Sequence, residues 1–457
     1  MKVLLLSPAY LPTFMRNGRC DYLSWSNTQW FPIWLSYCGA LLVKHRHSVF
    51  LIDAPAQGWD EKQTFDKIIG FAPELLVVYS STQSIECDVR FAEKVKNSRE
   101  CKIVLVGPFV SLVAEKIMST YRDIDACVQG EFEYPVLELA NGVSADTIKN
   151  LVGRKNGELI CNPIREVLDG AALDAMPFVT RFYSTHLDIR QYKTPSEPYP
   201  FVDFFTGRGC SWGHCTFCLW PHAFFRKGTY TTRSVDNVIE EIKYIKTDLL
   251  HVKGVFIQDD TFPQERAMVF SEALLANDLK ISWSCYARGE LDYEAMCLMK
   301  RAGCRTLHVG YESKDNEILR ISGKGLSSER MTEFTADAHK AGLRIHGDFL
   351  LGFPGEDERS MEATIAWAKK LNPHTAQFLK VQVYPGTALE ALAVRNEYKG
   401  LQGKTRLMDA QLSSWIKKAY RTFYLRPGFL IRVIFHPREY IFLRLRSVMN
   451  MMQRLLE

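Results

Sequence analysis

Short apolar runs alternate with amphipathic stretches through the first 150 residues of the chain. The apolar runs cover residues 2–7, 49–52, 75–79, 102–106 and 126–128, and helical patterns cover residues 34–44, 87–96, 110–120 and 135–141. Buried strands that alternate with helices are typical of a parallel, doubly wound sheet. Residues 1–150 are therefore predicted to form a Rossmann-like α/β domain.

A second alternating series begins near residue 200. Apolar strand patterns at residues 201–206, 254–258, 281–287, 305–309, 344–351 and 377–384 are separated by helical patterns at 235–247, 265–277, 293–301, 330–340 and 360–371. Strand–helix units in series predict a partial (β/α)6 TIM-like barrel over residues 200–390, with its active groups at the carboxyl ends of the strands. Residues 151–199 are predicted to be a linker with a hairpin turn at Asn156-Gly157, and residues 391–457 a helical extension.

Three cysteines, Cys210, Cys215 and Cys218, follow the first barrel strand within nine residues. Three thiolates on one loop can bind three irons of a [4Fe–4S] cluster and leave the fourth iron open to the amine and carboxylate of a small molecule. We expect that molecule to be S-adenosylmethionine (SAM). The alternative is a zinc site that uses the same cysteines with His214 or His222.

This loop resembles the cluster motif of the radical SAM superfamily. That family usually places three residues between the first two cysteines, whereas this chain places four. Gly213 tolerates a positive φ angle, which would allow the longer loop to fold back. The motifs that follow at later strand ends resemble the cobalamin-linked branch of the superfamily and disfavour a zinc module: Asp259-Asp260-Thr261-Phe262, Gly310-Tyr311-Glu312-Ser313, Gly352-Phe353-Pro354-Gly355-Glu356 and Tyr384-Pro385-Gly386-Thr387.

The resemblance implies roles in SAM binding for several of these side chains. Asp259 or Asp260 would accept hydrogen bonds from the methionine ammonium group. Arg288 would pair with the SAM carboxylate or with a neighbouring acid. The remaining assignments are Glu312 and Ser313 at the ribose or the carboxylate, and Phe217, Gly352 and Pro354 beside the adenine. The alternative for each charged residue is an ordinary ion pair at a strand end.

Small and polar residues also end the strands of the first domain: Asp53-Ala54-Pro55, Ser80-Ser81-Thr82-Gln83, Gly107-Pro108-Phe109 and Gly130-Glu131. Open α/β sheets bind ligands at this edge. The segment resembles the cobalamin-binding domain that precedes many radical SAM enzymes, and the resemblance implies that Ser80, Ser81, Thr82, Gln83, Gly107, Pro108, Gly130 and Glu131 contact cobalamin. The Asp-x-His-x-x-Gly motif is absent, so no side chain is an obvious cobalt ligand. Residues 30–35 are predicted either to wall the corrin or to pack in the core.

Composition and charge narrow the functional class. The chain has 457 residues, of which 47% are hydrophobic and 24% charged, and its net charge of +5 does not indicate a nucleic-acid partner. No apolar run is long enough to span a membrane, and Lys2–Leu6 is typical of a buried strand rather than a signal peptide. The twelve cysteines are mostly isolated. A cytoplasmic protein with free thiols is therefore expected, with the inner face of the membrane as a further possibility for its location.

The resemblance implies an enzyme whose reduced cluster cleaves SAM to a 5′-deoxyadenosyl radical, which removes hydrogen from an unactivated C–H bond. Cobalamin would then take part in a methylation or in a rearrangement such as ring contraction. The reductant would be an electron donor such as flavodoxin or ferredoxin. The alternatives are a cobalamin-dependent C-methyltransferase acting on another natural product and a corrinoid or iron–sulfur binding protein without turnover.

Residues 215–221, 30–35 and 52–55 resemble most the hopanoid-biosynthesis branch, which lies near the anaerobic Mg-protoporphyrin ester cyclases. This likeness implies a small-molecule or lipid-linked substrate. Basic and apolar residues are mixed through residues 426–446. Such a segment is typical of peripheral membrane contact, and the alternative is packing against the open side of the barrel.

Overall fold

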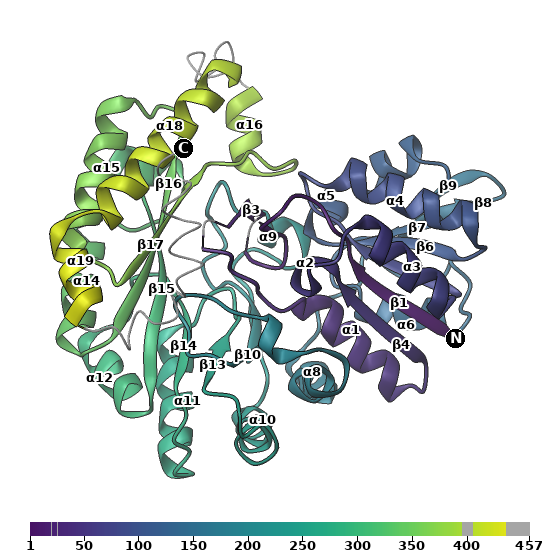
Figure 1. Cartoon of the computed structure of the whole chain (residues 1–457), viewed down its shortest axis with the longest axis horizontal. Coiled ribbons are helices and arrows are strands. Elements are labelled where there is room, and N and C mark those ends of the chain that lie inside the picture. Colours follow the sequence, from purple (N-terminus) through teal and green to yellow (C-terminus); the bar gives the residue numbers. More distant parts are fainter. Residues whose placement is uncertain (20, 25, 395–404, 436–457) are drawn as a thin grey trace.

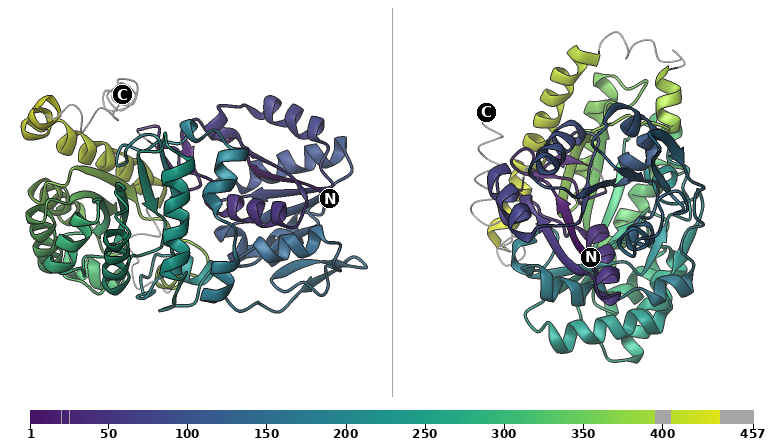
Figure 2. Two further views of the ribbon diagram at one scale, coloured as in Figure 1. Left: turned by 90° about the horizontal axis from the view of Figure 1, so that it is seen from below. Right: turned by 90° about the vertical axis from the view of Figure 1, so that its right-hand side faces the viewer.

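The structure is a computed structural model that describes residues 1–19, 21–24, 26–394 and 405–435. Two α/β units lie side by side along the long axis of the molecule (Figures 1 and 2). The first contains a sheet with the order β4-β1-β5-β6-β7-β8-β9. Its parallel strands are β1 (Lys2–Ser7), β4 (Ser48–Asp53), β5 (Leu75–Tyr79), β6 (Lys102–Val106) and β7 (Ala126–Val128). The predicted doubly wound domain is confirmed.

Helices cover both faces of this first sheet. One face packs against α1 (Ile33–Lys44) and α6 (Glu133–Ala140). The other packs against α3 (Glu61–Phe71), α4 (Ile85–Ser98) and α5 (Pro108–Thr120). Sequence reasoning missed α3, because only Thr64 and Ile68 in that helix are fully buried and its apolar stripe is narrow.

The hairpin predicted at Asn156-Gly157 is present, and it belongs to the first sheet. Strand β8 (Leu151–Lys155) pairs antiparallel with β7 and with β9 (Glu158–Cys161). Both turn residues have positive φ angles. The sheet therefore extends past residue 150, where the domain was expected to end. Between β9 and the second unit lie α7 (Gly170–Ala175), α8 (Val179–His186) and a 3-10 turn (Ile189–Gln191).

The second unit is a curled sheet of six parallel strands in chain order. The strands are β10 (Phe201–Phe204), β13 (Gly254–Ile257), β14 (Trp283–Ala287), β15 (Cys304–Glu312), β16 (Arg344–Leu351) and β17 (Thr375–Lys380). Outside them lie α10 (Val235–Asp248), α11 (Gln264–Ala276), α12 (Tyr293–Arg301), α14 (Ser328–Lys340) and α15 (Glu358–Leu371) (Figure 1). The predicted half-barrel is confirmed.

The sixth strand is displaced from its predicted position. It was expected at residues 377–384, but β17 ends at Lys380, which pairs with Leu351, the last residue of β16. Because β16 stops there, residues 382–384 have no strand beside them to continue the ladder. Two tyrosines of α18 (Thr405–Tyr424) cover the outer edge of β17: the Tyr424 hydroxyl bonds both the N–H and the carbonyl of Ala376, and the Tyr420 hydroxyl accepts from the N–H of Phe378.

The C-terminal segment is described only as far as α19 (Pro427–Phe435), so residues 436–446 of the predicted amphipathic tail lie outside the described residues. Phe429 of α19 is buried, whereas Leu430, Ile431, Ile434 and Phe435 are exposed. Within the tail, Arg426 and Arg432 both donate to Asn372 Oδ1 at 2.7 Å, which agrees with the alternative in which this segment packs on the barrel. Within the part of the chain that the structure describes, no helix is long and apolar enough to cross a membrane.

The two units are joined by a buried arginine. Arg208 pairs with Glu131 at 2.6 Å and with Glu133 at 2.7 Å, both at the tip after β7. Its guanidinium lies 4.5 Å from the ring of Trp34, which stacks on Trp220. These contacts place residues 30–35 in the core between the units, so the packing interpretation of that segment is confirmed.

A buried carboxyl makes stability depend on pH. Glu197 is 1% exposed, and burial raises its pKa to about 8. A carboxyl whose pKa is raised by folding stabilises the fold fully below its ordinary pKa, and this contribution is lost as the pH rises through the raised value. We expect the free energy of unfolding to fall as the pH rises from about 5 to about 8, by up to about 1.4 kcal/mol per pH unit from this group, and to level off at higher pH.

Urea unfolding of Glu197→Gln at several pH values checks this expectation. The free energy of unfolding of the variant should fall less steeply as the pH rises, because the glutamine side chain cannot ionise. Glu294→Gln, at an exposed position on α12, is the matched control. Identical pH dependence in the wild type and Glu197→Gln would contradict the assignment.

Candidate functional site

The cluster loop is carried by a two-stranded ribbon that sequence reasoning did not predict. Strand β11 (Gly207–Gly209) pairs with β12 (Tyr230–Thr232), and the loop runs between them to the short helix α9 (Trp220–Ala223). Gly213 has a φ of 64°, as predicted, and its N–H lies 3.4 Å from Cys210 Sγ. A Cβ at this position would lie 2.5 Å from the backbone nitrogen of Gly228. The longer loop thus needs glycine at this position.

The three cysteines are half-buried and influence one another electrostatically. Burial raises the pKa of Cys215 to about 12 and also raises that of Cys218. Among the described side chains, no three His, Cys, Asp or Glu residues are grouped closely enough to bind one metal ion. A zinc site needs such convergence, whereas each thiolate of a [4Fe–4S] site binds its own iron. Three thiolates on one loop fit a [4Fe–4S] cluster, in which each binds a separate iron.

A loop from the middle of the barrel holds the cluster loop in place. It follows α13 (Asn316–Ile321) and contains Gly323-Lys324-Gly325. Trp212 Nε1 donates to the carbonyl of Gly323 at 2.9 Å, and Thr216 donates from its N–H to Ser322 at 2.8 Å. Sequence reasoning missed Lys324. The feature in the sequence that could have identified it is a lysine between two glycines. Both glycines have positive φ angles in the structure, and this lets the backbone at Lys324 approach the cluster loop.

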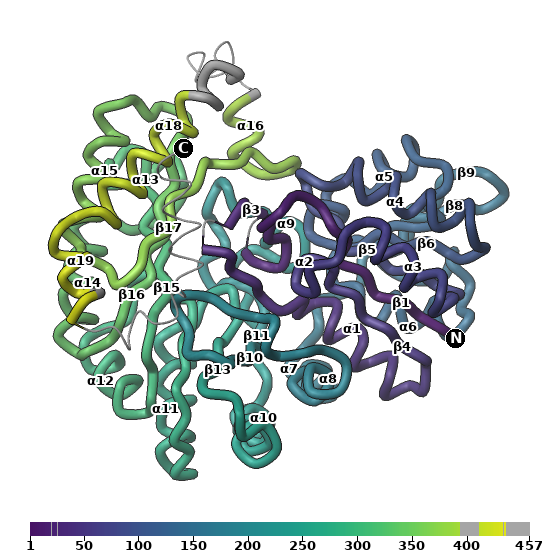
Figure 3. Tube along the Cα trace, viewed as in Figure 1, coloured from purple at the N-terminus to yellow at the C-terminus, as the bar shows by residue number. Residues whose placement is uncertain are grey.

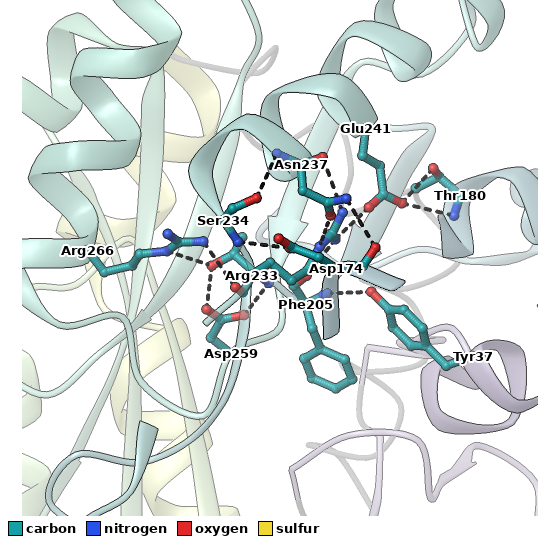
Figure 4. A network of polar contacts seen from close by, with 11 residues as sticks. Tyr37, Asp174, Thr180, Phe205, Arg233, Ser234, Asn237, Glu241, Asp259 and Arg266 are labelled. Atoms are coloured by element: carbon teal, nitrogen blue, oxygen red, sulfur yellow. Dashed lines mark hydrogen bonds and ion pairs between the residues drawn. The ribbon is translucent and has the colours of Figure 1, made fainter. Parts of the chain in front are cut away.

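The two neighbouring aspartates after β13 have different surroundings. Asp259 is fully buried, and its oxygens accept from Thr206 N at 2.7 Å, Thr206 Oγ1 at 2.6 Å and the Tyr230 hydroxyl at 2.6 Å. Figure 4 shows it within a polar network that also contains Arg233 and Arg266. Asp260 instead accepts from the N–H of Gly209 at 2.9 Å and pairs with Arg19. Asp259 therefore anchors the ribbon, and Asp260 is the aspartate that faces the cluster loop.

Arg288 lies at the end of β14 with one nitrogen available. Its guanidinium lies 4.4 Å from the ring of Trp212, and its Nη2 donates to the carbonyl of Lys324 at 2.9 Å. It also pairs with Glu290 at 3.0 Å, a side chain that is half exposed. Nη1 is buried without a hydrogen-bond partner. A buried donor of this kind requires an acceptor, and the SAM carboxylate is one that fits.

Glu312 ends β15 in an unusual conformation. Its φ of 59° is in the left-handed region, at a register shift between β15 and β16. Burial raises the pKa of this carboxyl, and Lys324, 3.1 Å away, acts against that rise. Ser313 Oγ lies 3.2 Å from Thr364 Oγ1 of α15. Glu312 and Ser313 both remain candidates for SAM binding.

The predicted adenine wall is assembled from two distant segments. Phe217 of the cluster loop contacts Phe353 edge to face, with ring centroids 5.6 Å apart. The N–H groups of Gly352 and Phe353 both donate to Glu356, at 2.6 and 3.1 Å, which fixes the turn that contains Pro354. Phe217 and the Gly352–Pro354 turn therefore lie together, as the adenine assignment requires.

Four of the predicted cobalamin residues line a small hollow between the two units: Ser80, Ser81, Thr82 and Pro108. Gly107 lies directly beneath it, and a Cβ there would be 2.7 Å from the carbonyl of Ser80. Gln83 contacts the adjoining segment through the carbonyl of Asp21 at 3.4 Å. Gly130 and Glu131 do not line the hollow. Glu131 pairs instead with Arg208.

The N-terminal segment and the end of the cluster loop also line the hollow. Arg16, Arg19, Leu219 and Trp220 line it, and Trp220 Nε1 donates to the carbonyl of Arg19 at 2.8 Å. Figure 3 shows the N-terminal segment around β3 (Tyr22–Leu23) crossing beside α9. No histidine lines the hollow in the described part of the chain. The two arginines were not predicted.

The strand-end tips that line the hollow lie at the edge where open α/β sheets bind ligands. The order of the five parallel strands places the reversal between β1 and β5, beside the tip at Ser80. Ser80 and Ser84 both donate to Asp88, at 2.7 and 2.6 Å, as does Arg16 at 2.8 Å. The tip is thus held rigidly.

Family models match both units. The radical SAM superfamily model matches residues 204–368, and the B12 binding domain model matches residues 22–140. An uncharacterised methyltransferase of Pyrococcus horikoshii is 31% identical over 90% of this chain and 92% of its own length. The cytidylyl-2-hydroxyethylphosphonate methyltransferase of Streptomyces wedmorensis is 24% identical over 87% of this chain and 82% of its own. The anaerobic magnesium-protoporphyrin IX monomethyl ester cyclase of Rubrivivax gelatinosus is 22% identical over 94% of this chain and 78% of its own length.

Solved structures show the same fold. The methyltransferase TsrM from Kitasatospora setae, with cobalamin and a [4Fe–4S] cluster bound, has a TM-score of 0.64 at 16% identity, covering 85% of this chain and 73% of TsrM. The cobalamin-dependent radical enzyme OxsB has a TM-score of 0.62 at 15% identity, covering 85% of this chain and 54% of OxsB. The chain belongs to the radical SAM superfamily, among the enzymes that carry a B12-binding domain and use a [4Fe–4S] cluster, SAM and cobalamin.

Proposed function

We propose that this enzyme is a methyltransferase that adds a methyl group to a carbon atom of a small-molecule substrate. The observation that carries the proposal is the shared wall between the two cofactor sites. Leu219 and Trp220, which follow Cys218 directly, line the hollow assigned to cobalamin. A corrin bound there would lie beside the SAM site, as transfer of a methyl group between cofactors and substrate requires. A sensor that only binds corrinoid needs no such arrangement.

When bound, the cluster with SAM supplies one-electron activation of a C–H bond, and cobalamin supplies a carrier for the methyl group. The chain's own residues bind SAM and orient it. Arg288 Nη1 is placed to hold the SAM carboxylate, and Asp260 is assigned to the ammonium group. Trp212 and Phe217 cover the loop with apolar surface and exclude water from the site.

The names of the relatives favour methylation over rearrangement. Two of the relatives reported above are named methyltransferases, and the third is a cyclase. Ring contraction of a hopanoid-like lipid stays a prediction from the resemblance of residues 215–221, 30–35 and 52–55. The exposed apolar side chains of α19 are the described feature that would support contact with a lipid. The reductant stays assigned to a flavodoxin or ferredoxin.

Methylation consumes one SAM for the methyl group and releases S-adenosylhomocysteine, whereas rearrangement does not. We therefore expect the anaerobically reconstituted enzyme, loaded with reduced cobalamin and given SAM, to form about one S-adenosylhomocysteine per cobalamin before any substrate is added. Chromatography of the quenched reaction measures it, and enzyme without cobalamin is the control. 5′-Deoxyadenosine without S-adenosylhomocysteine would favour rearrangement instead. Absence of both products would favour the binding protein without turnover.

A further inference from the structure

Lys324 carries a charge into the interior beside the cluster loop. Its side chain is 6% exposed, and its Nζ lies 3.1 Å from Oε1 of Glu312, which is 7% exposed. Burial of an ion pair costs desolvation free energy that the attraction between the charges often fails to offset. Stability alone is therefore a poor explanation for placing this pair inside the barrel.

The surrounding backbone is shaped to admit the pair. A Cβ at Gly310 would lie 2.5 Å from Glu312 Oε1 and 3.0 Å from Lys324 Nζ, so glycine leaves the space that both charged groups occupy. The φ of 59° at Glu312 costs of the order of 1–3 kcal/mol for a residue with a side chain. Strain of this kind concentrates at functional sites, and here it directs one carboxylate toward one ammonium group.

The loop that carries this ammonium group contacts both chain neighbours of the ligand Cys215. Thr216 donates from its N–H to the carbonyl of Ser322 at 2.8 Å, and a Cβ at Gly323 would lie 2.4 Å from the carbonyl of His214. The backbone of Lys324 is fixed, because its carbonyl accepts from Arg288 and the carbonyl of Gly323 accepts from Trp212. The charge is thus held at a constant position relative to the cysteine loop.

We propose that Lys324 is a positioning residue that holds Glu312 in its strained conformation and raises the reduction potential of the cluster bound by Cys210, Cys215 and Cys218. Iron–sulfur potentials respond to the net charge around the cluster. Reduction adds one electron to a cluster that already carries three thiolates, so a fixed positive charge nearby stabilises the reduced form. The proposal does not depend on whether the enzyme methylates or rearranges its substrate.

The test is an anaerobic redox titration with dithionite, without SAM, in which EPR follows the reduced cluster. Lys324→Gln is expected to lower the equilibrium constant for reduction at least tenfold, which is about 59 mV for one electron. Lys324→Arg keeps the charge and should stay near the wild type. Lys314→Gln is the control, because Lys314 lies close in the chain but is 37% exposed and pairs with Glu329. Equal potentials for Lys324→Gln and Lys314→Gln overturn the proposal.

A second pair of variants excludes compensation by Glu312, which could take up a proton once Lys324 is lost. Glu312→Gln removes the negative charge and leaves the lysine, so its potential should rise above that of the wild type. The double variant Glu312→Gln/Lys324→Gln differs from Glu312→Gln only by the lysine charge. Its equilibrium constant for reduction should be at least tenfold lower than that of Glu312→Gln. If Lys324→Gln binds no iron, Glu312→Gln alone decides, and an unchanged or lowered potential overturns the proposal.

Discussion

Replacing any one of Cys210, Cys215 and Cys218 by alanine is expected to give a protein without its brown colour and without detectable cleavage of SAM. Each thiolate holds a separate iron, and loss of one leaves two protein ligands for a cluster that needs three. The loop around them has support that does not involve the cysteine sulfurs, because Trp212 donates to the carbonyl of Gly323 and Thr216 donates to the carbonyl of Ser322. The apoprotein should therefore keep its fold. The effect is measured by iron content, by the absorbance of the thiolate-to-iron charge-transfer bands and by formation of 5′-deoxyadenosine after reduction with dithionite.

The matched control is Cys161→Ala, since Cys161 is exposed on β9 and distant from the loop. It should keep the colour, the iron content and the cleavage of SAM. A colourless wild-type protein that holds one zinc atom per chain would contradict the cluster assignment altogether. Retention of full activity in any one of the three loop variants would remove that cysteine from the ligand set.

Replacing Arg208 by methionine is expected to destabilise the protein by about 3–5 kcal/mol, because the change leaves buried carboxylates without their partner. Glu133 is fully buried and Glu131 is nearly so, and Arg208 is the cation that pairs with both. Burial already raises the pKa of Glu133, with Arg208 acting against that rise. Urea unfolding measures the loss, and the two units should separate at a lower urea concentration than in the wild type.

Arg226→Met is the control for this variant. Arg226 pairs with Glu166, but both side chains are mostly exposed, at 63% and 78%. Exposed ion pairs contribute at most about 1 kcal/mol. Adding Glu131→Gln and Glu133→Gln to Arg208→Met should restore part of the lost stability, since no uncompensated charge then remains. A stability of Arg208→Met equal to that of Arg226→Met would show that the buried arginine does not hold the units together.

The sequence predicted the elements whose burial is continuous. Strands β5, β6, β7 and β16 lie at their predicted residues, because a parallel strand covered on both sides gives an unbroken or regularly alternating apolar run. The shifted end of β17 could not be predicted, because it depends on where the neighbouring strand stops. The ribbon of β11 and β12 was missed because its residues are glycine, arginine, threonine and tyrosine without an apolar pattern.

The candidate site divides in a similar way. The cysteines and Arg288 could be found because motif spacing and strand ends mark them in the chain. The sequence could not distinguish Asp259 from Asp260. Only the folded ribbon shows which of the two carboxylates accepts hydrogen bonds from Thr206 and Tyr230. Arg16 and Arg19 line the hollow from an irregular segment of the first unit, and such a segment leaves no periodic signal in the sequence.

The tyrosines of α18 have a consequence for any shortened form of this enzyme. Their hydroxyl groups occupy the hydrogen-bonding positions of Ala376 and Phe378, which an incoming strand from another molecule would otherwise use. A chain truncated before residue 405 would present that row of amides and carbonyls to solvent. Self-association through sheet extension, rather than a simple loss of activity, would then be the first effect of removing the C-terminal helices.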